Sequence, residues 1–172
     1  GLANSFLKEI WLNKGGYTVK FVRYLHAGQA KYGALDGDRI EEIAGDIYTD
    51  YALTGITYPL ATVKLLPPVT PSKLLAVGAN YFDHIKEMHV RAGRAGEPEL
   101  PREPVLFIKA QTSLCADGDA IVYPKHARLV HYEAEIGVVI KDRIKDVSEA
   151  EALGHVLGYT CANDVSERIM QR

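Results

Sequence analysis

The stretch HYEAEIGVVI, residues 131–140, carries the signal on which the expected fold and site both depend. Its second half is rich in Ile and Val and predicts a buried β-strand. Glu133 and Glu135 stand two residues apart at the start of this strand, so both point to one face, roughly 6–7 Å apart along the chain. Two like charges held this close repel each other, and burial increases the repulsion.

A divalent cation between Glu133 and Glu135 would relieve that repulsion. Hard oxygen ligands favour Mg²⁺, Mn²⁺ or Ca²⁺ over zinc. The alternative is a strand end that carries two solvated glutamates. Spacing alone favours this alternative, because Glu-x-Glu is a common string.

Composition is that of an ordinary globular protein. The chain has 172 residues, of which 47% are hydrophobic and 24% charged, which is enough for one sizeable core. The net charge of −2 and the pI near 6.3 argue against nucleic acid or an anionic membrane as the main partner. Cys115 and Cys161 match no metal or redox spacing, so we expect two free thiols and a cytoplasmic location.

The first 66 residues divide into two parts. Residues 1–18 fit poorly with the rest of the chain and are predicted to be a non-native leader, with a short helix over 5–12 that Gly15 and Gly16 end. Residues 19–66 are predicted to form a small β-rich N-terminal domain. It begins with a strand over 20–25 and continues with a hairpin around Asp36-Gly37-Asp38, since Asp-Gly is a strong hairpin signal.

The Pro-rich segment from Pro67 to Pro71 predicts a linker, and residues 67–172 are assigned to a catalytic domain. Short strands outnumber helices there and do not alternate with them, so we expect a β-rich α+β fold. The expected strands are 73–77, 105–108, 120–123, 131–140 and 159–163. A helix is expected over 83–94, a mobile loop over 95–104, and a second helix from the capping box at Ser148 to Gly158.

His84 and Glu87 lie three residues apart at the start of the first predicted helix, on one face and within contact distance. A carboxylate beside an imidazole orients it and strengthens it as a general base for activating water. The alternative is a surface pair near a helix N-terminus, which this spacing alone favours.

Four blocks in order resemble the fumarylacetoacetate hydrolase family: NYFDHIKE (80–87), PVLFIK (104–109), HYEAE (131–135) and GYTCANDVS (158–166). The resemblance covers residues 19–172 and is strong from Pro67 onward. The form HYEAE most resembles the branch that includes isomerase/decarboxylases of aromatic-acid catabolism, with acylpyruvate hydrolases as close relatives.

The resemblance implies a set of site residues. The metal ligands for Mg²⁺ or Mn²⁺, with Ca²⁺ also possible, would be Glu133, Glu135 and Asp164. The catalytic dyad would be His84 and Glu87, on a segment that orders over the site as a lid. Lys109 would lie near the substrate, although its position alone fits a strand-end lysine in solvent equally well.

The resemblance also implies a mixed β-roll core, usually a homodimer, that acts on 2-oxo acids or 1,3-diketones through an enolate. The reaction would be C–C bond hydrolysis, decarboxylation or tautomerisation, in the catabolism of aromatic compounds or amino acids. No nucleic acid or membrane partner is expected.

Two departures from the family pattern matter. After Ser166 the family usually reads Ala-Arg-Asp, whereas this chain reads Glu167-Arg168-Ile169. No Gly or Pro marks a natural stop at Arg172, and a later lysine-containing strand of the family is absent, so we expect a C-terminally truncated sequence. The alternative to an enzyme is therefore an inactive or incomplete fragment with a structural or assembly role.

Overall fold

The computed structural model describes residues 9–14 and 17–171, which form two compact units. The larger unit contains the described residues up to Thr70 together with those from Cys115 onward, and the smaller unit is Pro71–Leu114. Strands predominate in the larger unit, and the smaller unit combines two strands with one α-helix, which confirms the predicted β-rich α+β class. The predicted division into residues 1–18, 19–66 and 67–172 stays a prediction.

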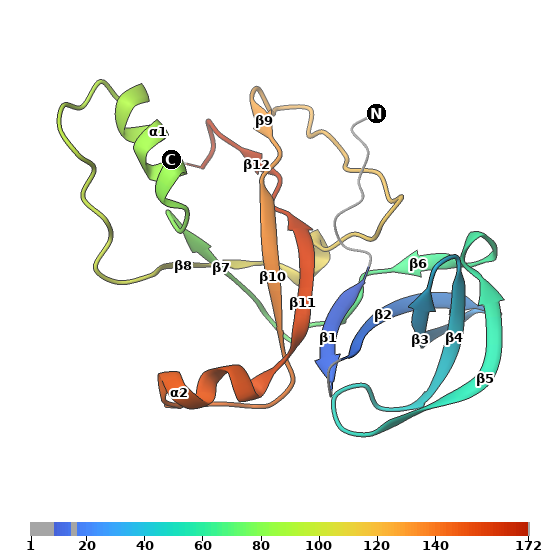
Figure 1. Cartoon of the computed structure of the whole chain (residues 1–172). Helices are drawn as coiled ribbons and strands as arrows, with labels where there is room; N and C mark the ends of the chain where they lie inside the picture. Colours follow the sequence, from blue (N-terminus) through green and yellow to red (C-terminus); the bar gives the residue numbers. More distant parts are fainter. Residues whose placement is uncertain (1–8, 15–16, 172) are drawn as a thin grey trace. The chain divides into compact units, whose positions relative to one another are not determined.

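The larger unit is built on an eight-stranded sheet with the order β10-β11-β1-β2-β3-β4-β5, and β6 pairs with β2 (Figure 1). All its pairings are antiparallel. Its strands are β1 (Ile10–Lys14), β2 (Tyr17–His26), β3 (Gln29–Asp36), β4 (Arg39–Gly45), β5 (Tyr51–Pro59), β6 (Lys64–Leu66), β10 (Ala134–Ile140) and β11 (Val156–Asn163). The short strands β9 (Val130–His131) and β12 (Ser166–Glu167) form a separate pair.

The core of the larger unit lies on both faces of β2. Phe21 packs on one face with Ile10 and Leu157, whereas Val22 and Tyr24 pack on the other. Side chains alternate along a strand, so consecutive buried residues require cover on both sides. The predicted strand over 20–25 and the hairpin between β3 and β4 are both confirmed.

Residues 10–12 are in a strand, so the predicted helix over 5–12 is wrong there, and its residues 5–8 lie outside the described part of the chain. Ile10 is fully buried, and β1 pairs with β2 along its whole length. A Cβ on Gly158 would stand 2.5 Å from the Trp11 carbonyl oxygen. Gly158, expected to end a helix, instead lies inside β11 and allows β1 to approach.

β10 and β11 lie side by side, in orange and red in Figure 1, with Val138 opposite Tyr159 and Gly137 opposite Thr160. Burial alternates along β10, and its exposed positions all carry apolar residues: Ile136 is 68% and Val138 51% exposed. The prediction of a buried strand is therefore wrong for this face. The strand itself is confirmed, but it begins at Ala134, after a break at Tyr132 and Glu133.

Two other expected elements differ. Residues 120–123 form no strand, and Val122 is 81% exposed, because no neighbouring strand pairs with this apolar run. The capping box of Ser148 and Glu151 is confirmed, but α2 (Glu149–Ala152) continues only as the 3₁₀ turn η3 (Leu153–His155). The chain then enters β11 at Val156, because pairing with β10 replaces the predicted last helical turn.

The smaller unit consists of the antiparallel pair β7 (Leu74–Gly78) and β8 (Val105–Lys109), joined through α1 (Phe82–Arg91) and a loop. These elements confirm the strands and the helix predicted for this region, with the helix ending earlier, at Arg91. Residues 95–104 form no helix or strand, as expected from their Gly and Pro content. Two further 3₁₀ turns in the described part of the chain are η1 (Leu60–Thr62) and η2 (Gln111–Ser113).

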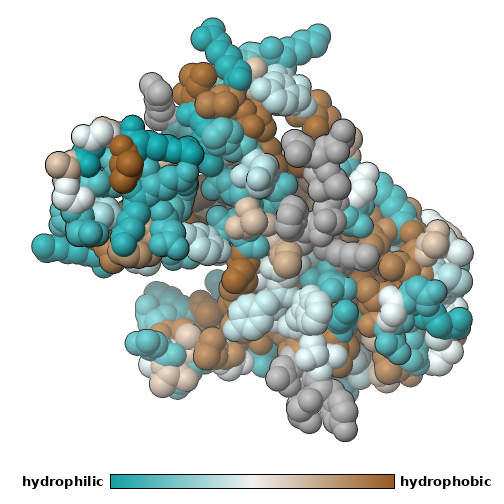
Figure 2. Space-filling model, turned by 45° about the horizontal axis from the view of Figure 1, so that its top comes forward, coloured by the Kyte–Doolittle hydropathy of each residue, from teal (hydrophilic) through white to brown (hydrophobic). Residues whose placement is uncertain are grey.

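Hydrophobic side chains, brown in Figure 2, gather at several places on the surface among hydrophilic ones. None of the helices in the described ranges has the length and apolar character that a bilayer crossing requires.

We expect Ile10→Ala to lower the free energy of unfolding by about 3 kcal/mol, because it leaves a cavity beside Phe21 and Leu157. Urea unfolding followed by the fluorescence of Trp11, the only tryptophan, measures this change next to the substituted residue. The matched control is Ile56→Ala, since Ile56 is 51% exposed on β5. Equal midpoints for the two variants would show that β1 adds nothing to the core.

Candidate metal centre and catalytic residues

The carboxylate corner, defined as Glu133, Glu135 and Asp164, is placed by the pairing of β10 with β11. The Asp164 amide donates to the Glu133 carbonyl oxygen at 2.9 Å, one step beyond the paired residues Ala134 and Asn163. Glu133 and Asp164 therefore stand opposite each other at the end of the ladder. Glu135 lies on the less exposed face of β10, and Glu133, just before the strand, is also only partly exposed.

The break before β10 is held by a side chain. The Glu133 amide donates to Oδ1 of Asn163 at 3.1 Å, while the Glu133 carbonyl oxygen accepts from Asp164. Both backbone groups of Glu133 are therefore satisfied by Asn163 and Asp164, at the end of β11. This arrangement gives a physical reason for an Asn-Asp sequence at the end of β11.

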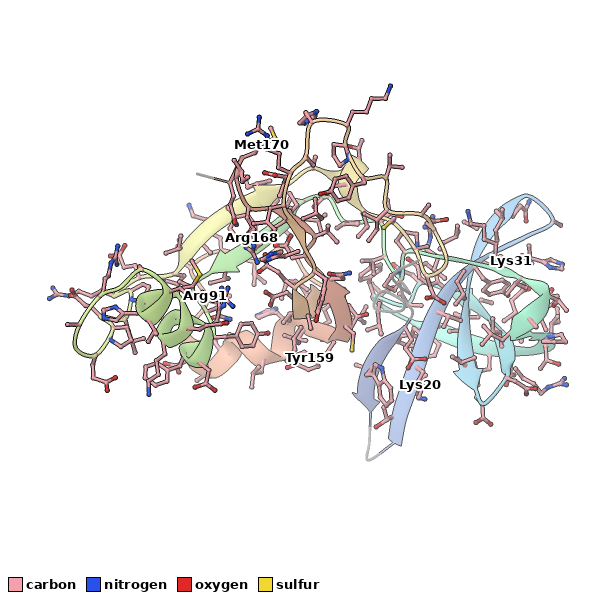
Figure 3. The ribbon with its side chains drawn as sticks, turned by 90° about the horizontal axis from the view of Figure 1, so that it is seen from above. Lys20, Lys31, Arg91, Tyr159, Arg168 and Met170 are labelled. Atoms are coloured by element: carbon pink, nitrogen blue, oxygen red, sulfur yellow. The ribbon has the colours of Figure 1, made fainter. Side chains whose placement is uncertain are left out.

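Arg168 is the cation beside the carboxylate corner. Its Nη1 lies 2.9 Å from Oε1 of Glu133, and the two side chains are only 23% and 22% exposed. Its Nε also donates to Nδ1 of His131 at 3.2 Å, and its Nη1 to Oε1 of Gln171 at 3.0 Å. Arg168, labelled in Figure 3, directly follows β12. Because the pair is largely shielded, the charge of Glu133 is better compensated than in an exposed ion pair.

Sequence reasoning missed Arg168 and His131 as members of this site. Arg168 was noted only within a departure from the family pattern, although an arginine stands at the same place in the usual Ala-Arg-Asp. The shared arginine was the feature of the sequence that could have indicated a role for Arg168 in the site. His131 had no signal, because its contact with Arg168 spans 37 residues of sequence.

The chemistry of the donor set fits a hard divalent cation, since all three members of the corner are carboxylates. Among residues 9–14 and 17–171, however, no three His, Cys, Asp or Glu side chains converge closely enough to form a metal-ligand cluster. In this structure the positive charge next to Glu133 is the Arg168 guanidinium. The ligand roles of Glu133, Glu135 and Asp164 stay predictions.

Glu167 fastens the segment that carries Arg168. Its Oε1 accepts from the amides of Arg128 and Leu129, both at 3.0 Å, and its Oε2 accepts from the amide of Met170 at 2.6 Å. These backbone hydrogen bonds, with Arg128 and Leu129 foremost, lower the pKa of the Glu167 carboxyl to about 2. The side chain is therefore ionised throughout the range in which the protein would work.

In the smaller unit, α1 presents His84 and Glu87 on one face, as the i, i+3 spacing predicts. Nδ1 of His84 lies 3.7 Å from Oε2 of Glu87, and the side chains are 44% and 51% exposed. Arg91, which Figure 3 labels, lies one turn further along the helix. It is closer to Glu87 than His84 is, with Nη2 2.5 Å from Oε1. Glu87 is thus shared between the imidazole and a guanidinium that sequence reasoning did not consider.

Lys109 stands at the end of β8, opposite Leu74 of β7, and is partly buried. Its Nζ lies 5.8 Å from the centre of the Phe107 ring, which is within range of a cation–π contact. His84, Glu87 and Lys109 all belong to the smaller unit, whereas the carboxylate corner belongs to the larger one. The predicted site residues thus form two separate groups, each organised within its own unit.

Residues 73–172 match the family model described as "Fumarylacetoacetate (FAA) hydrolase C-terminal", and residues 19–68 match one described as "Rv2993c-like, N-terminal". The first match covers more than half of the chain. The chain therefore belongs to the fumarylacetoacetate hydrolase family, as its four sequence blocks indicate.

Relatives of known sequence or structure agree. A protein of Archaeoglobus fulgidus is 41% identical over 130 residues, with 76% of this chain and 48% of the relative covered. A protein of Burkholderia ambifaria named "Putative hydrolase" is 38% identical, with 89% and 57% covered. The solved 5-carboxymethyl-2-hydroxymuconate delta-isomerase of Mycobacterium smegmatis is 35% identical, with a TM-score of 0.74 and 88% and 57% covered. The chain thus spans about half the length of the relatives that it matches.

The hydrogen bonds of Glu167 predict a defined pH dependence. The pKa of its carboxyl falls from 4.5 to about 2 on folding, so its stabilising contribution is complete above pH 4.5 and is lost as the pH falls toward 2. At pH 6 we expect the urea midpoint of unfolding to be lower for Glu167→Gln than for the unsubstituted chain. The difference between the two midpoints should become smaller at pH 4 and smaller again at pH 3. A difference between the midpoints that stays constant over these three pH values would contradict the lowered pKa of Glu167.

Proposed function

We propose that this chain carries the metal centre of an enzyme that acts on 2-oxo acids or 1,3-diketones through an enolate. The observation that carries the proposal is the register of β10 and β11, which sets Glu133 opposite Asp164 with Glu135 two residues along. All three side chains offer oxygen donors, which favour Mg²⁺ or Mn²⁺, and a bound cation would offset their mutual repulsion as it draws them together.

Glu133, Glu135 and Asp164 would hold the cation. When bound, it would supply the positive charge that stabilises an enolate oxygen next to a carbonyl group. Arg168 keeps the charge of Glu133 compensated before the cation arrives, which lowers the cost of gathering the acidic side chains.

His84 is the proposed general base, and Glu87 the group that orients it. For C–C bond hydrolysis, His84 takes a proton from water, and for decarboxylation or tautomerisation it moves a proton on the substrate. Lys109 offers a positive charge to a substrate carboxylate or to the developing oxyanion. Glu87 must favour His84 over Arg91 for this role, so binding of substrate would have to shorten the 3.7 Å separation.

The names of two structural neighbours support this substrate class. One is the 5-carboxymethyl-2-hydroxymuconate delta-isomerase of Mycobacterium smegmatis, and the other, at 32% identity and a TM-score of 0.73, is the 2-hydroxyhepta-2,4-diene-1,7-dioate isomerase of Mycobacterium marinum. A 2-hydroxy-2-ene acid is the enol form of a 2-oxo acid. The proposed enolate chemistry is consistent with these names. Action in aromatic-compound or amino-acid catabolism, assembly as a homodimer and a cytoplasmic location are part of the same proposal.

A second candidate function is a non-catalytic role in structure or assembly. Two ion pairs favour it, since Arg168 already contacts Glu133 and Arg91 already contacts Glu87. In that case the arginines would be permanent partners of the carboxylates. Metal binding and turnover decide between the two functions.

Glu135→Gln is expected to weaken Mn²⁺ binding by more than about 10-fold, because it removes one charged oxygen donor from the corner. Isothermal titration of the apoprotein with MnCl₂ measures the change. Glu149→Gln, an exposed substitution in the first turn of α2, is the matched control and should bind as the unsubstituted chain does. Identical affinities for the two variants would exclude Glu135 as a ligand.

His84→Ala is expected to lower kcat for an acylpyruvate or for oxaloacetate by roughly 10²–10⁴-fold, the usual contribution of a general base. His89→Ala, on the same helix, is the control and should stay within about twofold of the unsubstituted enzyme. The proposal fails if both variants are equally active. A chain that binds no Mn²⁺ and turns over neither substrate would favour the non-catalytic role.

A further inference from the structure

Glu167 joins two segments that lie far apart in the sequence. Its carboxylate accepts the amides of Arg128 and Leu129 with one oxygen and the amide of Met170 with the other. The bonded residues are 38 and 39 positions before Glu167 and three after it. A single side chain therefore closes the turn after β12 and ties it to the segment that leads into β9.

Arg168 starts from this fastened backbone. Its own amide donates to the Leu129 carbonyl oxygen at 2.8 Å, and the neighbouring ladder pairs Glu167 with Val130 and Ser166 with His131. The Cα of Arg168 is thus held on both sides. The guanidinium therefore contacts His131 and Glu133 from a fixed backbone position.

A long side chain can orient another group only if the backbone from which it extends is fixed. Arginine has several rotatable bonds, and its planar fork selects an orientation only when the backbone that carries it is fixed. In this chain the backbone is fixed by the hydrogen bonds that the Glu167 carboxylate accepts from the amides of Arg128, Leu129 and Met170. We call this set of three hydrogen bonds the Glu167 staple.

We propose that Glu167 is a positioning residue for the metal centre: it holds the β9–β12 corner so that Arg168 presets the carboxylate of Glu133. Arg168 contacts Oε1 of Glu133, so the second oxygen of the same carboxylate is the donor that it orients. Groups that orient a ligand in this way commonly contribute 10–100-fold to metal affinity. The inference rests on the proposed metal centre.

The alternative is that Glu167 only stabilises the turn after β12 and does not position Arg168. Glu151 provides a matched comparison, because its carboxylate also accepts from a backbone amide, that of Ser148, and from the Ser148 hydroxyl. It caps α2 and has no role in the carboxylate corner. Glu151→Ala should therefore remove hydrogen bonds to the backbone and to Ser148, as a control for lost stability, while the surroundings of Glu133 stay unchanged.

The experiment compares Glu167→Ala, Glu167→Gln, Arg168→Gln and Glu151→Ala in the full chain. Titration with MnCl₂ gives the metal affinity, and amide hydrogen exchange of Arg128, Leu129 and Met170 reports the staple. The ¹H–¹⁵N signal of Arg168 Nε, which donates to His131, reports the arginine side chain in the metal-free protein. Thermal melting of each variant gives its stability.

We expect Glu167→Ala to weaken Mn²⁺ binding about 10-fold, to speed exchange of the three amides and to shift or broaden the Arg168 Nε signal. Glu167→Gln keeps one acceptor oxygen and should fall between Glu167→Ala and the unsubstituted chain. Arg168→Gln should weaken Mn²⁺ binding to a similar extent while the amides stay protected. A double variant that combines Glu167→Ala with Arg168→Gln should bind no more weakly than Arg168→Gln alone, because both changes act through one contact.

The inference is overturned if Glu167→Ala melts as low as Glu151→Ala yet binds Mn²⁺ like the unsubstituted chain. It is also overturned if the Arg168 Nε signal is unchanged in Glu167→Ala. If the unsubstituted chain binds no Mn²⁺, the proposed metal centre is wrong, whatever the role of Glu167. The Nε signal then still decides whether Glu167 sets the position of Arg168.

Discussion

The antiparallel register of β10 and β11 is the constraint on which the rest of the candidate site depends. It sets Glu133, just before β10, against Asp164, and a shift of one residue in the register would turn Glu135 to the opposite face of the sheet. Gly137 makes the close pairing possible, because a Cβ at this position would stand 2.8 Å from the Thr160 methyl group. The strands thus approach closely inside the ladder, four residues from Glu133.

Charge compensation is the second common theme. In each unit an arginine contacts a glutamate for which we propose a role in chemistry: Arg168 with Glu133, and Arg91 with Glu87. The two cases differ in burial, since the first pair is about one-fifth exposed and Glu87 about one-half. Solvent screens the second pair more strongly, so Glu87 can change partners at lower cost than Glu133.

Local patterns were predicted well where neighbours in sequence supply the structure. The β3–β4 hairpin follows from Asp-Gly, α1 from its start beside Asp83, and the capping box from Ser148 and Glu151. Predictions failed where distant strands decide. Val156 continues a helical pattern but pairs with β10, and the apolar run around Val122 has no partner strand. The helix predicted over 5–12 failed at Ile10, which lies in a strand and in the core because β1 fits between β2 and β11.

The sequence by itself determined the family, the β-rich class and the identity of the acidic, basic and imidazole side chains, because these follow from residue type, order and short-range spacing. Only the tertiary structure decided which of them meet. Arg168 reaches His131 across 37 residues, and Glu167 is bonded to Arg128 across 39. No periodicity encodes such contacts, since they arise only when the β9–β12 pair forms and brings both backbones within hydrogen-bond distance.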